Sequence, residues 1–120
     1  MQILAYEPTW DKAISQKDRE EFEAIFHSLL VFPPFTVIRH AVNHKGELLV
    51  TSIIHNTADQ ELDFHAMKIS YQKDGRKIAE AKFTLPSHLI PSKTSMPWTF
   101  IFPAGSWHDD QAGLGELYFG

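Results

Sequence analysis

The sequence contains no cysteine among its 120 residues. Disulfides, thiolate nucleophiles and cysteine-ligated zinc are therefore excluded, and the composition does not indicate an oxidising compartment. Basic residues are also few, because 11 Lys and Arg stand against 15 Asp and Glu and give a net charge of −4. A sequence-independent grip on a phosphate backbone needs a basic field, so nucleic acid is not expected as a partner.

Long apolar runs are missing as well. The longest, residues 28–35 (SLLVFPPF), is interrupted by two prolines and is far shorter than the roughly 20 residues that a membrane span needs. The first ten residues lack the basic start and the apolar stretch of a signal peptide. We therefore expect a cytoplasmic protein that does not insert into a membrane.

Sequence signatures of catalysis and of cofactor binding are absent too. The six glycines form neither of the phosphate-binding patterns GxGxxG and GxxxxGK[ST], and no GxSxG element marks a serine nucleophile. Of the seven histidines, His40 and His44 share a predicted strand face, but four residues of extended chain separate them by about 13 Å. We therefore expect no catalytic residue, no cofactor and no metal site, and a protein that is not an enzyme.

Large apolar residues, by contrast, are abundant, because Leu, Ile, Val and Phe occupy 33 of the 120 positions. Ser15, three residues before Asp18, resembles the start of a capping box. Apolar residues then recur at helical spacing, which predicts an amphipathic helix over residues 16–29 that packs through Phe22, Ile25, Phe26 and Leu29. The prolines at positions 33 and 34 prevent its continuation.

After Phe35 the sequence alternates in the manner of β-strands. Residues 36–42 and 47–56 predict a hairpin around Lys45-Gly46 in which Arg39 lies opposite Ser52. Both faces of this hairpin are apolar, so we expect an opposing sheet to cover one face and the helix to cover the other. The first face carries Val37, Ala41, Leu48, Val50 and Ile54, and the second carries Ile38, Val42, Leu49 and Ile53.

Residues 63–72 and 77–85 predict a second hairpin around Asp74-Gly75, with Ile78 on its solvent side. A final strand over residues 98–102 places three aromatic side chains in the core: Trp98, Phe100 and Phe102. The expected fold is mainly β, an antiparallel immunoglobulin-like β-sandwich with one N-terminal amphipathic helix. One domain spans residues 1–105, and the glycine-rich residues 106–120 are expected to form a loose C-terminal tail.

Several stretches of the chain match a known domain: Trp10 ahead of the short acidic helix, residues 46–51 (GELLVT) running to His55-Asn56, the Asp74-Gly75 turn followed by Ile78-Ala79 and Phe83, and residues 96–103 (MPWTFIFP). Together they resemble the SLAP domain, named for the S-layer assembly protein of the accessory Sec export system in Gram-positive bacteria of the Bacillus group. The resemblance extends over residues 8–103, and the last stretch is its most specific part. It implies a non-enzymatic interaction module, an accessory factor for protein export or S-layer assembly, whose protein partner is the export machinery or its cargo.

The residues themselves leave a second class of function open. A helix followed by antiparallel strands also fits a small ligand-binding or enzymatic domain of cystatin-like or NTF2-like fold. Within the interaction-module interpretation, Phe32 and Phe35 beside the two prolines are the candidate partner contacts, because proline fixes the loop backbone in advance. The alternative for these two rings is that they pin the loop to the sandwich.

Overall fold

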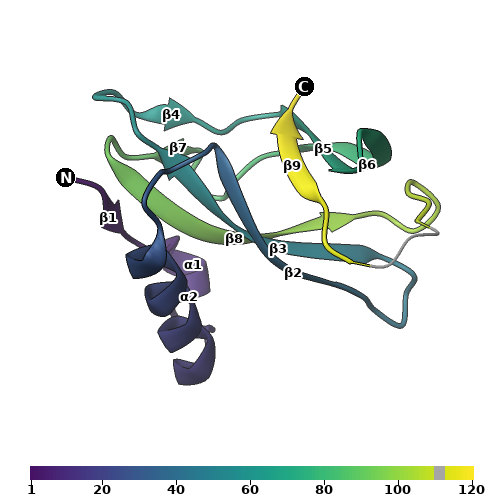
Figure 1. Ribbon diagram of the computed structural model, residues 1–120, viewed down its shortest axis with the longest axis horizontal. Coiled ribbons are helices and arrows are strands. Elements are labelled where there is room, and N and C mark those ends of the chain that lie inside the picture. The colour runs from purple at the N-terminus through teal and green to yellow at the C-terminus, as the bar shows by residue number, and fades with distance from the viewer. Residues whose placement is uncertain (110–112) are drawn as a thin grey trace.

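The computed structural model describes residues 1–109 and 113–120 and is mainly β, as the sequence predicts. Its sheets are curled, and two helices precede most of the strands (Figure 1). None of the described helices is long and apolar enough to cross a membrane. The elements in chain order are β1 (Ile3–Leu4), α1 (Pro8–Asp11), α2 (Gln16–Ser28), β2 (Phe35–Val42), β3 (Leu48–Asn56), β4 (Leu62–Asp63), β5 (Met67–Lys73), β6 (Arg76–Phe83), β7 (Leu89–Ile90), β8 (Thr94–Phe102) and β9 (Glu116–Phe119).

The strands form three sheets. The largest has the order β1-β8-β3-β2, the second has the order β6-β5-β9, and β4 and β7 form a small pair. The main core contains buried side chains from both larger sheets and from the segment between β4 and β5, so residues far apart in sequence enclose one another. These include Leu48, Val50, Ile54, Phe64, Ile69, Tyr71, Phe100 and Phe102.

The helices lie against the other side of the four-stranded sheet (Figure 1). The Ser15 side chain accepts a hydrogen bond from the Asp18 amide at 3.1 Å, so the predicted helix start is correct. Phe22 and Phe26 pack with Ile53 of β3 in a second, smaller core. The prediction that the first hairpin is covered on both faces is confirmed for β3, because Ile53 lies in this second core while its neighbour Ile54 lies in the main one. It is wrong for the end of β2, where Ala41 and Val42 are exposed.

The register of the first hairpin differs from the predicted one. Val42 pairs with Leu48, so the loop is one residue longer than expected, and Gly46 provides the positive φ that ends it. A β-bulge between Val37 and Arg39 then shifts the pairing of the first residues of β2 by one, so that Val37 pairs with Ser52. The longer loop, not the bulge, places Arg39 opposite Thr51 instead of Ser52, on the face that α2 covers. There its exposed guanidinium forms ion pairs with two carboxylates of the helix, those of Asp18 and Glu21.

The second hairpin contains a comparable irregularity. Asp74 and Gly75 both have positive φ, as a two-residue Asp-Gly turn requires. Between Tyr71 and Gln72 the register shifts, and Ile78 is the extra residue on β6. The prediction that Ile78 faces solvent is wrong, since its side chain is 4% exposed and belongs to the main core.

The last predicted strand begins earlier than expected, because β8 starts at Thr94 and includes Pro97. The Ser95 carbonyl accepts a hydrogen bond from the Ala5 amide, so the backbone groups of Ser95 and Pro97 are directed toward β1 and away from β3. The missing N–H of Pro97 therefore costs no bond in the β3 ladder. Trp98 packs on the main core and lies 5.8 Å from the Trp10 ring, which joins the two cores.

The expected loose tail over residues 106–120 is corrected by the structure. Residues 110–112 of that segment lie outside the described residues, but Trp107 packs against the main core and β9 pairs antiparallel with β5. Leu117 of β9 is 5% exposed. The end of the chain therefore completes the second sheet, because its alternate apolar residues find a hydrophobic surface that no local pattern reveals.

Candidate binding groove beside two strand edges

An apolar groove of about 820 Å³ lies where the α2–β2 loop (residues 29–34) meets β2 and β9. Its volume falls within the range usual for ligand-binding sites, about 300 to 1,000 Å³. The lining comes from two parts of the chain that are more than 70 residues apart in sequence, residues 28–31 with 33–37, and residues 115–119. Among these lining residues only Glu116 carries a charge at neutral pH.

The groove walls expose large apolar side chains. Leu30 is 97% exposed and Val31 75%, while Tyr118 and Phe119 on β9 are 43% and 40% exposed. Folding does not require an apolar side chain at a position that stays in water. A contiguous exposed apolar patch of this kind indicates a contact surface for another molecule. We call these four residues, Leu30, Val31, Tyr118 and Phe119, the groove patch.

The two predicted contact residues, Phe32 and Phe35, do not belong to the exposed groove patch. Phe35 is 7% exposed, and its ring lies 4.8 Å from that of Phe119 and 5.9 Å from that of Phe100. Phe32 is half-buried and stacks on Phe26 at 5.6 Å. Both rings therefore anchor the loop to the two cores, and only Phe35 contributes to the groove lining. The loop that carries these two residues does line the groove, but its most exposed residues are the aliphatic pair that precedes Phe32.

Both strands that border the groove are edge strands, since β2 and β9 are the last strands of their sheets. The Gly120 amide donates to the Lys68 carbonyl of β5 at 2.8 Å, which fixes the direction of each backbone group along β9. In an antiparallel ladder successive residues point to opposite sides. The amide and carbonyl groups of Leu117 and Phe119 therefore face away from β5, toward the groove side.

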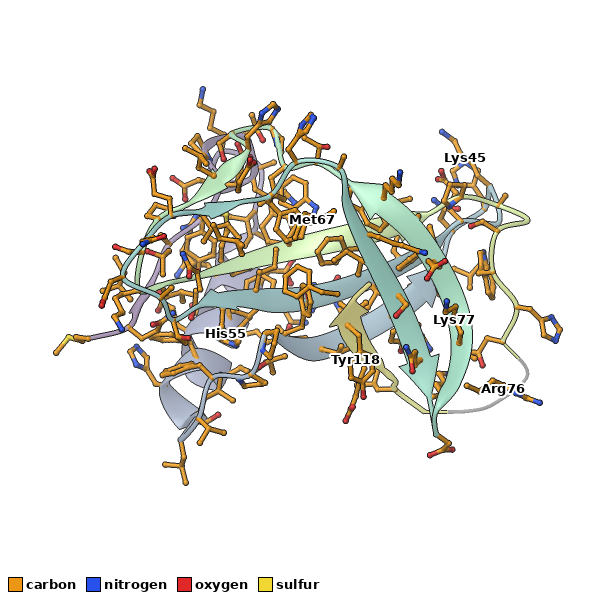
Figure 2. All side chains as sticks on the ribbon, turned by 90° about the horizontal axis from the view of Figure 1, so that it is seen from above. Lys45, His55, Met67, Arg76, Lys77 and Tyr118 are labelled. Carbon is orange, nitrogen blue, oxygen red and sulfur yellow. The ribbon has the colours of Figure 1, made fainter. Side chains whose placement is uncertain are left out.

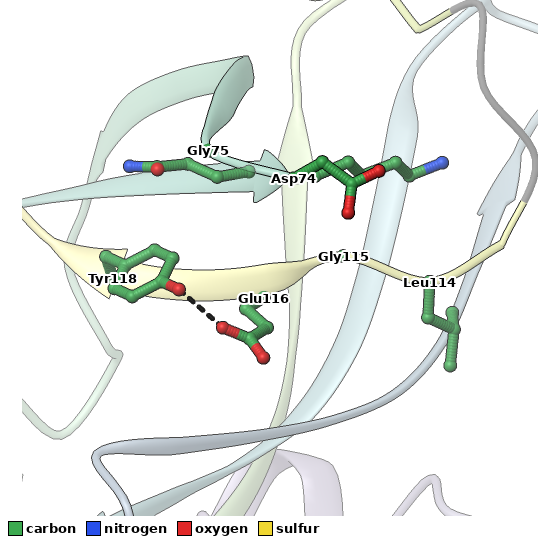
Figure 3. A pocket seen from close by; sticks show the side chains of 8 residues that line it. Asp74, Gly75, Leu114, Gly115, Glu116 and Tyr118 are labelled. Carbon is green, nitrogen blue, oxygen red and sulfur yellow. Dashed lines mark hydrogen bonds between the residues drawn. The ribbon is translucent and has the colours of Figure 1, made fainter.

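A second, polar hollow of about 260 Å³ lies on the other side of β9 (Figure 3). Glu116 and Tyr118 line both hollows, and the Tyr118 hydroxyl donates a hydrogen bond to the Glu116 carboxylate. This bond raises the pKa of Tyr118. Figure 2 shows Tyr118 beside the β5–β6 hairpin, which carries Arg76 and Lys77. The second hollow is also lined by Lys73, whose ammonium group pairs with Asp109 at 2.5 Å.

His55 connects the loop to the sheet. It is 6% exposed, its Nε2 lies 2.9 Å from the Thr36 hydroxyl and its Nδ1 2.6 Å from the Ser95 hydroxyl. The Phe32 ring covers it at 5.2 Å. Burial lowers the pKa of His55, labelled in Figure 2, to about 4, so the imidazole is neutral at pH 7 in the folded protein.

This burial predicts a pH-dependent stability. In the unfolded chain His55 takes up a proton near pH 6.5, whereas in the folded protein it resists protonation down to about pH 4, so stability falls as the pH drops through this interval. We expect a loss of about 2 kcal/mol between pH 7 and pH 5 from this residue. Urea denaturation at both pH values measures it, with His55→Gln as the comparison. An unchanged pH dependence in that variant would show that other groups cause it.

The remaining sequence candidates for chemistry do not assemble into a site. His40 lies on β2, 2.8 Å from the Tyr71 hydroxyl, and that hydroxyl also accepts a hydrogen bond from the Gly115 amide. Burial raises the pKa of Tyr71. Within the described residues, no group of three or more His, Asp or Glu side chains is arranged to hold a metal ion. His40 thus joins β2 to the second sheet, a structural contact that the sequence did not indicate.

Fold and groove together define a class of protein, a small mainly β domain whose apolar groove lies beside two strand edges. The family model of the SLAP domain matches residues 4–116, nearly the whole chain. The chain therefore belongs to the SLAP domain family. Neither the curated proteins nor the solved structures gave a match to it.

Proposed function

We propose that this SLAP domain is a non-enzymatic protein-interaction module that acts in the cytoplasm as an accessory factor for protein export or S-layer assembly. The observation that carries the proposal is the groove patch, in which Leu30 and Val31 are 97% and 75% exposed on a loop anchored by the half-buried Phe32 and the buried Phe35. A rigid loop loses little conformational entropy when it docks on a partner. The export role rests on the family, and the expected partner is a component of the export machinery or its cargo.

We also propose that the two larger sheets form an immunoglobulin-like sandwich. Two features support this arrangement over a cystatin-like or NTF2-like fold with a ligand pocket. The main core draws side chains from both sheets, and the helix packs on the opposite face of the four-stranded sheet through Phe22 and Phe26. A helix in that position does not cover a pocket on the core side.

The groove patch can be tested with a double substitution, Leu30→Ser and Val31→Ser. Both side chains are exposed, so the free energy of unfolding should change by less than about 0.5 kcal/mol. Co-purification from cells of the Bacillus group that possess the accessory Sec system should lose its Sec or S-layer proteins, identified by mass spectrometry. The reason is that a few residues near the centre of a protein contact carry most of its binding energy, and Leu30 and Val31 are the most exposed residues of the groove patch.

The matched control is Leu89→Ser with Ile101→Ser. These side chains are 39% and 46% exposed and do not line the groove. This control should retain the co-purified proteins. If it loses them to the same degree, the groove is not the contact surface, and if neither chain captures an export component, the proposed role in export is wrong.

A further inference from the structure

We propose that the groove accepts an extended segment of a partner protein, which adds to the free edge of β9 as a further strand. The inference rests on the proposed function, because it specifies the form in which the partner binds. Its first basis is the backbone of β9, where Leu117 and Phe119 direct their amide and carbonyl groups away from β5. In the described part of the chain β2 runs close by but is not hydrogen-bonded to β9. An unpaired strand edge is a template for main-chain pairing with another chain.

The second basis is the asymmetry of the two sides of β9. Leu117 lies in the main core and Phe119 packs on Phe35 and Phe64, so these residues face inward, where the groove is apolar. Glu116 and Tyr118 lie on the opposite face of the strand and line both the polar hollow and the groove. Side chains of an added strand alternate in the same way. One set would meet the apolar walls of the groove, and the other would lie next to Glu116.

The negative charge of Glu116 determines which side chains the added strand can carry on its outward face. Glu116 is the one charged residue among those described that line the groove, and the whole chain carries a net charge of −4. Opposite charges side by side on neighbouring strands stabilise pairing, whereas like charges weaken it. The segment that fits this edge therefore alternates aliphatic or aromatic residues with polar ones and carries a Lys or Arg opposite Glu116. An acidic segment should be rejected.

The probe is a capped peptide of sequence TVTVKVT, which has the required alternation and one basic residue. Its control, TVTVEVT, differs only in the sign of that charge. Amide hydrogen exchange by NMR should show the Leu117 and Phe119 amides exchanging at least about tenfold more slowly at saturating TVTVKVT. The Tyr118 and Gly120 amides point to β5 and should change little. TVTVKVT should bind about threefold more tightly than TVTVEVT, and Glu116→Gln should abolish this preference.

Three results would overturn the inference. The peptide could shift the resonances of Leu30 and Val31 without slowing Leu117 and Phe119, which would mean docking through side chains alone, as for an amphipathic helix. The two amides could slow with rising protein concentration in the absence of peptide, which would make a second copy of the chain the occupant. The peptide could fail to bind at all while Leu30→Ser with Val31→Ser still abolishes co-purification of export components, in which case the proposed function stands without strand addition. Conversely, slowed amides together with a failure of the parent chain to co-purify any export component would support strand addition and contradict the export role.

Discussion

Phe100→Ala is expected to lower the free energy of unfolding by about 3 to 5 kcal/mol. Phe100 is fully buried at the centre of the main core, and its ring lies 5.0 Å from that of Phe83, 5.9 Å from that of Phe35 and 6.0 Å from that of Phe64. These neighbours come from three different parts of the chain, so they cannot all collapse into the cavity that the substitution leaves. For a domain with a total stability of about 5 to 15 kcal/mol, such a loss is a large fraction of the whole.

Chemical denaturation followed by circular dichroism measures this loss. The adjacent Ile101 provides the control, because it is on the same strand, points to the opposite face and is 46% exposed. Ile101→Ala should cost less than about 1 kcal/mol. Equal losses for the two variants would mean that the side-chain orientation of β8 is not as described.

Gly115→Ala is expected to cost about 3 kcal/mol, a large effect for the addition of one methyl group. A Cβ atom at this position would lie 2.3 Å from the carbonyl oxygen of Gln72 and 2.9 Å from Cγ of Lys73, so the chain before β9 would have to move away from β5. Moving it would also lengthen the 2.7 Å hydrogen bond from the Gly115 amide to the buried Tyr71 hydroxyl. β9 would then lose its place in the sheet, and Leu117 would become exposed.

Thermal denaturation gives the stability, and amide exchange at Tyr118 and Gly120 reports whether β9 is still paired with β5. Leu114→Ala, one residue earlier and 53% exposed, should leave both measurements nearly unchanged. A Gly115→Ala variant with the stability of the parent chain would show that the β5–β9 contact is looser than described. The variant should also lose binding of TVTVKVT, because that peptide needs an ordered β9.

Local chemistry explains why some elements could be predicted from sequence. The start of α2 at Ser15 depends on one side-chain contact three residues away, and its apolar stripe repeats within a few turns. The Asp74-Gly75 turn depends on two residues that tolerate positive φ. The two covered faces of β3 followed from apolar residues at successive positions, and the identity of the family followed from short stretches that recur together.

Features that depend on contacts between distant segments were missed or misplaced. A β-bulge adds one residue to a strand without altering its composition, so the alternation of the sequence assigned Ile78 to the wrong face. Arg39 was assigned the wrong partner because the loop of the first hairpin is one residue longer than its sequence indicated. The segment that contains β9 was expected to be a loose tail because it is rich in glycine and has little hydrophobic pattern. It is ordered by the buried surface of β5, to which Gly115 permits a close approach.

The groove shows the same division between sequence and tertiary structure. The sequence alone predicted that a partner binds at a proline-rich apolar loop, but it could not say which side chains of that loop face water. Phe35 is buried because Phe100 and Phe119 provide a surface for its ring, and Phe32 because Phe26 and His55 do. Leu30 and Val31 have no such surface and remain exposed. Exposure of an apolar side chain is set by what packs against it, and those partners lie far away in the sequence, so only the tertiary structure decided which residues form the groove.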